Sequence, residues 1–272
     1  MNGYVAIIYE GDKTEVNYWN SLWKTFFHND KACFISFPAG ENIYMLWKQL
    51  KDDDFNSDII EVVREYKPEA AGILGDLTRE DFQEVYLFFD YDPHNNNLSK
   101  DDCQSEKDVL RVMLRDFDNE TENGKLYISY PMSEALRDYN PWKCKAFSKC
   151  FINVEEIASY KEISGFGNPN ADYRKYDIEV WEMLLVIFLK RCACLLETDK
   201  DTLNPLGWYK SQVSAERIYD KESDLYTNQG KVFPLSAFPE FILEYFKKDK
   251  FEPIVEGFYH KVLSDDCDMT RG

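Results

Sequence analysis

Acidic residues directly follow two apolar segments in the first half of the chain. Glu10 ends the apolar run of residues 4–9, and Asp90 and Asp92 end the run of residues 84–89. Carboxylates held together repel one another unless a cation lies between them, and hard oxygen ligands with room for waters suit Mg²⁺ or Mn²⁺. Such a site can hold an attacking water and stabilise the leaving oxygen in phosphoryl transfer. The residue types therefore predict a divalent-metal centre.

The acids would be positioned by strands and helices that alternate through the first half of the chain. Short apolar runs without a helical period predict strands, and amphipathic stretches between them predict helices. This alternation is typical of a parallel sheet flanked by helices, in which ligands collect beyond the carboxyl ends of the strands. Asp90 and Asp92 alternate with Tyr91, so both side chains would point the same way if the strand continues. The predicted strands are 4–9, 33–37, 84–89 and 125–130, and the predicted helices are 14–27, 42–51 and 105–117.

The pattern changes after Asp138. We therefore expect an α/β domain at residues 1–138 and a mainly helical C-terminal extension at residues 139–272. The extension contains several stretches with helical periodicity, although no linker or repeat marks where it begins. Its predicted helices are 151–161, 177–197, 238–247 and 251–263.

The composition favours a folded protein with reduced thiols. Hydrophobic residues make up 44% of the chain, and no run approaches the roughly 18 apolar residues of a membrane span. The seven cysteines form an odd, irregular set, which argues against a disulfide framework. With no secretion signal at the N-terminus, these features predict a soluble, cytoplasmic protein.

The formal net charge of −18 limits how the chain could bind nucleic acid. Proteins that bind phosphates unaided usually carry a basic face, because affinity comes largely from neutralising the backbone. Either metal ions and a local basic patch supply the attraction, or a partner subunit brings the nucleic acid to the site. We favour a partner.

The chain contains the motifs IIYEGDKTEVNYW around Glu10 and YLFFDYD at Asp90 and Asp92. They resemble the two halves of the toprim domain found in topoisomerases, DnaG-type primases and OLD-family nucleases. The opening YEGDKTE and the later SYPMSEAL look most like the stand-alone toprim nucleases of bacterial phage defence, such as RloB-like proteins and the toprim subunits of the PARIS and AbiL systems. The likeness covers residues 3–137, about half of the chain.

This resemblance implies a toprim, Rossmann-like fold and a metal-dependent nuclease that cleaves DNA or RNA. Glu10 would be the acid/base and a metal ligand, Asp90 and Asp92 would be metal ligands, and Glu134 would be an accessory acid. The cofactor would be Mg²⁺ or Mn²⁺. The chain would act as a phage-defence (abortive-infection) effector controlled by an ABC- or SMC-like ATPase sensor, with a homodimer as a further option and no membrane association.

One position departs from the toprim pattern. Many toprim domains have a third acid two residues after the acidic pair, where this chain has His94. The departure puts a second tightly held metal in doubt, although His94 could ligate or orient a phosphate.

Several lysines are candidates for phosphate contact. Lys13 lies at the start of the predicted helix after Glu10, and Lys143, Lys145 and Lys149 are interleaved with aromatic residues. The second group could equally be the solvated face of a helix.

Glu15 and Glu134 each have a structural interpretation as an alternative to a functional one. Glu15 would stabilise the N-terminus of its helix through the helix dipole, which is the reading we prefer. Glu134 could simply open a helix for which Ser133 is the N-cap.

Two other function classes remain open. The FFDYD segment also resembles the nucleophile motif of haloacid-dehalogenase phosphatases, in which the first Asp is phosphorylated. Those enzymes carry the motif on their first strand, whereas here two predicted strands precede it. The other class is a non-catalytic acidic binding or regulatory subunit with a relic metal site.

Overall fold

The computed structural model describes residues 3–28, 32–91, 108–139, 151–197 and 205–246. The chain forms two compact units, Met1–Ile128 and Ser129–Gly272. This division lies ten residues before the predicted domain boundary at 138/139. The two units are described separately below.

A five-stranded sheet forms the core of the first unit. Its strands are β1 (Tyr4–Tyr9), β2 (Cys33–Pro38), β3 (Phe82–Asp90), β4 (Asp118–Asn119) and β5 (Gly124–Ser129). They lie in the order β2-β1-β3-β5-β4. β1 runs parallel to both β2 and β3, whereas the short β4 runs antiparallel to β5. The predicted parallel sheet is therefore confirmed at its centre, and the antiparallel edge strand is an addition that the sequence did not suggest.

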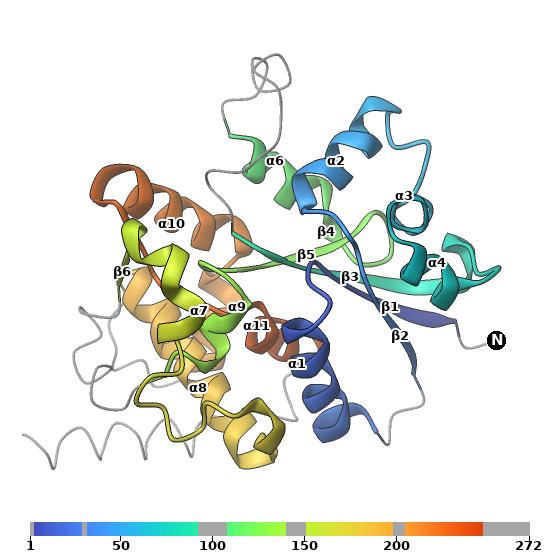
Figure 1. The fold of residues 1–272 in the computed structure, drawn as a ribbon. Helices are drawn as coiled ribbons and strands as arrows, with labels where there is room; N and C mark the ends of the chain where they lie inside the picture. Colours follow the sequence, from blue (N-terminus) through green and yellow to red (C-terminus); the bar gives the residue numbers. More distant parts are fainter. Residues whose placement is uncertain (1–2, 29–31, 92–107, 140–150, 198–204, 247–272) are drawn as a thin grey trace, which may run out of the picture. The chain divides into compact units, whose positions relative to one another are not determined.

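Helices cover both faces of this sheet. α1 (Thr14–Leu22) lies on one face, and the opposite face carries α2 (Ile43–Asp52), α3 (Ile59–Tyr66), α4 (Pro68–Leu74) and α6 (Val109–Asp116) (Figure 1). The chain moves from β1 to β2 in one direction and returns past β1 to reach β3. Because such crossovers are right-handed, the reversal places the connecting helices on opposite faces.

Local chemistry explains where these helices begin. Asn42, Asp58 and Asp108 each accept a hydrogen bond from a backbone N–H of the first turn, as N-cap side chains do. Tertiary contacts then join neighbouring helices. The indole Nε1 of Trp47 in α2 donates a hydrogen bond to Asp116 Oδ2 in α6 at 2.6 Å. The helix predicted from residue 14 to 27 is α-helical to Leu22 and π-helical from Trp23 to Phe27.

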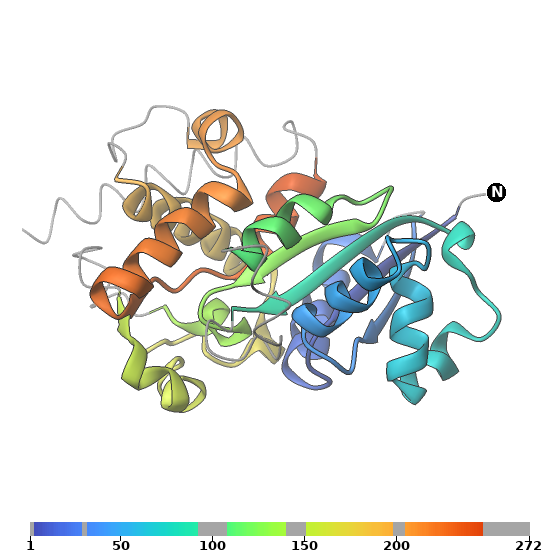
Figure 2. The same ribbon diagram turned by 90° about the horizontal axis from the view of Figure 1, so that it is seen from above.

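The second unit is built around α8 (Ile178–Leu195), most of whose residues are buried and which contacts α9 (Pro205–Gln212), α10 (Ala215–Gln229) and α11 (Ala237–Tyr245). Figure 2 shows α8 alongside α10. α8 and α11 correspond to predicted helices. The 151–161 prediction was wrong at its start, because Ile152–Asn153 forms strand β6 and pairs antiparallel with β7 (Lys231–Val232). The stretch 251–263 lies outside the described residues. Among the described residues of this unit, the other helices are 3₁₀ segments at Ser133–Arg137, Val154–Ser159 and Tyr173–Lys175, and α7 (Tyr160–Ile163), together with α9 and α10.

Within the described ranges, none of the helices combines the length and apolar character needed to cross a membrane.

Candidate functional site

The carboxyl ends of β1 and β3 meet at the point where the sheet changes its direction of winding. β1 is flanked by β2 on one side and by β3 on the other, although β2 comes between them in the chain. In open α/β sheets, a reversal of this kind leaves a crevice beyond the carboxyl ends of the two central strands. Glu10 follows β1 and Asp90 ends β3, so both acids lie at this switch point.

Two hydrogen bonds join Glu10 to β3. The Glu10 backbone N–H donates to the Phe88 carbonyl at 3.0 Å, which continues the strand pairing past Tyr9. The Asp90 backbone N–H then donates to Glu10 Oε2, also at 3.0 Å. The Glu10 carboxylate is therefore held against the end of the neighbouring strand, beside the residue that carries the second acid. Both acids are half-buried.

The described residues fit part of a hard-metal site. Glu10 and Asp90 supply carboxylate oxygens, the donors that Mg²⁺ and Mn²⁺ prefer. Asp92 and His94 lie outside the described residues, so their positions relative to this pair are not assigned. Within the ranges that the structure describes, no three His, Cys, Asp or Glu side chains come together as a metal-binding group. The pair would thus need ligands from water, substrate or a further residue to complete a coordination shell.

A third acid is packed into the turn between β1 and α1. Glu15 lies in the first turn of α1, as the helix-dipole interpretation expects, but its exposed fraction is only 7%. Its carboxylate lies over Gly11, since a Cβ added to Gly11 would stand 2.5 Å from Glu15 Oε2. The helix-dipole interpretation did not predict that Glu15 is buried. The spacing Glu-Gly-x-x-x-Glu could have indicated its burial, because a tight turn followed at once by a helix folds the first helical turn back over the glycine.

Tyr9 is buried on the same turn. Burial raises the pKa of the Tyr9 hydroxyl, a hydrogen bond with Ser36 opposes the rise, and the negative charge of Glu15 adds to it. These interactions place Glu15 near the end of β1 as well as over Gly11. The start of the turn after β1 is therefore packed against Glu15, whereas Asp12 and Lys13 farther along it are exposed.

Glu134 belongs to the second unit, in the 3₁₀ helix Ser133–Arg137. The alternative in which Ser133 caps this helix was wrong, because the N-cap residue is Met132 and no side chain caps it. Glu134 is only 3% exposed. Its Oε2 accepts a hydrogen bond from the Ser133 hydroxyl at 3.3 Å, and its Oε1 lies 4.0 Å from Lys161 Nζ. Glu134 is thus a buried carboxylate beside a surface cation.

Of the lysines predicted to contact phosphate, only Lys13 lies within the described residues. It is exposed at the N-terminal end of α1, and its backbone carbonyl accepts hydrogen bonds from the backbone and the side chain of Asn17. Lys143, Lys145 and Lys149 lie outside the described residues.

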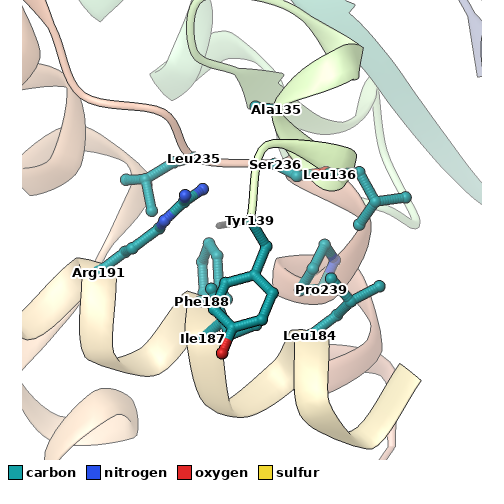
Figure 3. Close-up of a pocket in the computed structure, with 10 residues that line it drawn as sticks. All are labelled: Ala135, Leu136, Tyr139, Leu184, Ile187, Phe188, Arg191, Leu235, Ser236 and Pro239. Atoms are coloured by element: carbon teal, nitrogen blue, oxygen red, sulfur yellow. The ribbon is translucent and has the colours of Figure 1, made fainter. Parts of the chain in front are cut away.

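The second unit also contains a small pocket lined mainly by apolar side chains (Figure 3). Arg191 reaches it from α8 and donates hydrogen bonds to the carbonyls of Asp138 and Pro234. The guanidinium group thereby ties two chain segments to α8. With no carboxylate in its lining, the pocket is not the predicted acidic centre. Its lining residues are Ala135, Leu136, Tyr139, Leu184, Ile187, Phe188, Arg191, Leu235, Ser236 and Pro239.

Comparisons with models of protein families, with curated proteins and with solved structures gave no match.

Proposed function

We propose that this chain is a toprim-type, metal-dependent nuclease in which Glu10 and Asp90 form the described part of the catalytic centre. The observation that carries the proposal is the hydrogen bond from the Asp90 N–H to Glu10 Oε2, at the switch point of a sheet whose central strands are parallel. Two acids that are 80 residues apart in the chain occupy the edge where α/β folds bind ligands. The motifs around both acids supply the comparison with toprim nucleases.

The two acids would have different roles in cleavage. Glu10 would accept the proton of the attacking water, as a carboxylate general base does. Asp90, together with Asp92, would hold the divalent cation. When bound, that cation would supply Lewis-acid stabilisation of the phosphate charge.

The charge of the chain supports control by a partner. A net charge of −18 repels a polyanion, so a subunit with a basic surface would be needed to deliver nucleic acid efficiently. This agrees with the expectation of an ABC- or SMC-like ATPase sensor in a phage-defence system. In this proposal the partner both recruits the substrate and restrains an activity that would otherwise damage the host.

The decisive variants are Glu10→Gln and Asp90→Asn, each of which keeps the shape of the side chain and removes its charge. Cleavage of labelled DNA and RNA by the full chain, alone and co-purified with its native partners, should fall by about 10²–10⁴-fold in Mg²⁺. Glu84→Gln is the matched control, because Glu84 lies at the other end of the same strand and should be dispensable.

Wild-type cleavage rates in purified Glu10→Gln would refute the assignment. Hydrolysis of a small phosphomonoester without nucleic-acid cleavage would instead favour the haloacid-dehalogenase alternative. Urea denaturation of each variant checks that the fold is intact.

A further inference from the structure

The outer side of α4 exposes an isoleucine beside a glycine. Glu69, Gly72 and Ile73 are spaced i, i+3 and i+4, so they share one face of this helix. All three are exposed, and 48% of the Ile73 surface is accessible. The other side of α4 carries Ala70 and Leu74, which are buried. We call Glu69, Gly72 and Ile73 the α4 face; α4 lies beside α3 (Figure 1).

The packing of this chain does not require the glycine at position 72. Its backbone does not have a positive φ, and a Cβ added there would have no atom of the described residues within 4 Å. Gly75 differs, because it ends α4 with a φ of 53°, which favours glycine. A glycine inside a helix is less stable than an alanine, so Gly72 lowers the stability of α4. What it provides is a helix backbone open to close approach by another molecule.

The surroundings of the α4 face are acidic, because the nearby cations contact groups of the chain itself. Residues 58–81 contain seven acids and three cations, which gives −4. Arg64 and Arg79 donate hydrogen bonds to backbone carbonyls. Lys67 Nζ lies 3.9 Å from the carboxylate of Glu69, whose side chain is still 68% exposed. The other exposed acids of this stretch are Glu61, Glu65, Asp76, Glu80 and Asp81.

We propose that the α4 face is the docking surface for a basic protein subunit, with an apolar side chain of that subunit over Gly72 beside Ile73 and its cations near Glu69 and Asp76. Charge decides the occupant, since nucleic acid and a second copy of this acidic chain would both be repelled. The inference deepens the proposed function, on which it rests, by assigning the contact surface of the basic subunit that delivers nucleic acid.

The first measurement identifies what touches the α4 face. A photo-crosslinking amino acid replaces Ile73 in the full chain, in its native host, and mass spectrometry identifies the product. The control carries the same amino acid at Ile178, which is 43% exposed in the second unit. We expect a crosslink from position 73 alone to a subunit with a basic surface. A crosslink to a second copy of this chain, equal products from both positions or no product at all would overturn the inference.

The second measurement is the Kd of that subunit, once purified, for the full chain by calorimetry. Gly72→Arg should weaken binding by roughly 100-fold, because arginine fills the open surface and repels a basic partner. Ile73→Ala should weaken it roughly tenfold, as the loss of an apolar interface contact does. Gln229→Arg is the matched control, since it adds the same charge at an exposed helical position elsewhere. An unchanged Kd in both Gly72→Arg and Ile73→Ala would overturn the inference.

Salt tests the charge complementarity. Binding should weaken as salt rises, and Glu69→Gln should reduce this dependence. Affinity that does not depend on salt would contradict a basic partner. The proposed function fails separately, if Glu10→Gln still cleaves nucleic acid while subunit binding depends on Gly72. Loss of cleavage in Glu10→Gln, together with normal subunit binding by Gly72→Arg and Ile73→Ala, would refute the docking surface alone.

Discussion

At the scale of single residues, the turn after β1 depends on the absence of a side chain at position 11. The backbone at Gly11 does not have a positive φ. Glycine is needed at this position because the carboxylate of Glu15 fills the space that a side chain would occupy. Glu15 is buried, and a displaced carboxylate would lose its packing against Gly11. The position of Glu10 is thereby coupled to that of an acid five residues later in the chain.

We expect Gly11→Ala to lower the free energy of unfolding by about 1–3 kcal/mol, the usual cost of inserting a methyl group into packed surroundings. In a Glu15→Ala background the same change should cost much less, because the clashing carboxylate is gone. A double-mutant cycle from urea denaturation measures this coupling. Gly72→Ala is the control. No atom lies within 4 Å of its added Cβ, and it lies inside α4, so it should be neutral or stabilising. Additive effects of the two substitutions would contradict the proposed packing.

At the scale of elements, α10 is attached to the rest of the second unit through a fully buried acid. Glu222 has no exposed surface, and its Oε2 accepts a hydrogen bond from the Phe233 N–H at 3.0 Å. No donor among the described residues reaches its Oε1. Burial raises the pKa of Glu222 well above its usual range, with the hydrogen bond from Phe233 opposing the rise. Cys192 of α8 lies close enough for Glu222 and Glu240 to raise the pKa of its thiol further than burial alone does.

This raised pKa makes stability depend on pH in a defined direction. Above the ordinary value of 4.5, the unfolded chain releases a proton from Glu222 that the folded chain retains. The free energy of unfolding therefore falls as pH rises. The equilibrium constant of unfolding increases by up to about tenfold per pH unit until the pH reaches the pKa of Glu222 in the folded chain. Glu222→Gln removes this contribution. The urea concentration at which half of the Glu222→Gln protein is unfolded should equal that of the wild type near pH 4 and exceed it at pH 8. An equal difference at both pH values would show that Glu222 is ionised in the folded chain.

Element pairing also explains where local patterns failed. The stretch 151–161 has helical periodicity, yet it begins with a strand because β7, about 80 residues later, supplies a pairing edge. The helical character returns once Asn153 and Glu156 form a capping box around the following 3₁₀ helix. The local signal was present in this segment, but a partner that is distant in the chain decided its first residues.

At the scale of the whole molecule, a net charge of −18 acts on every encounter with nucleic acid. Long-range repulsion of a polyanion weakens as salt screens it. We therefore expect the association rate of the isolated chain with a labelled strand to rise between about 25 and 150 mM salt, a range over which the Debye length falls to roughly 8 Å. Stopped-flow fluorescence measures the rate. A rate that falls with salt would show that a basic face governs approach, and a basic partner would then be unnecessary for recruitment.

The sequence alone determined which segments would form the central strands and that acids would follow them. Apolar runs and the residues that end them are local signals, and the bounds of β1, β2 and β3 agree with the predictions to within two residues. Only the tertiary structure decided that β1 lies between β2 and β3, that the Asp90 N–H binds Glu10, and that Glu15 is buried. These features arise from contacts between chain segments up to 80 residues apart. Local periodicity carries no information about such pairings, because side-chain spacing in a strand is the same whichever neighbour the strand has.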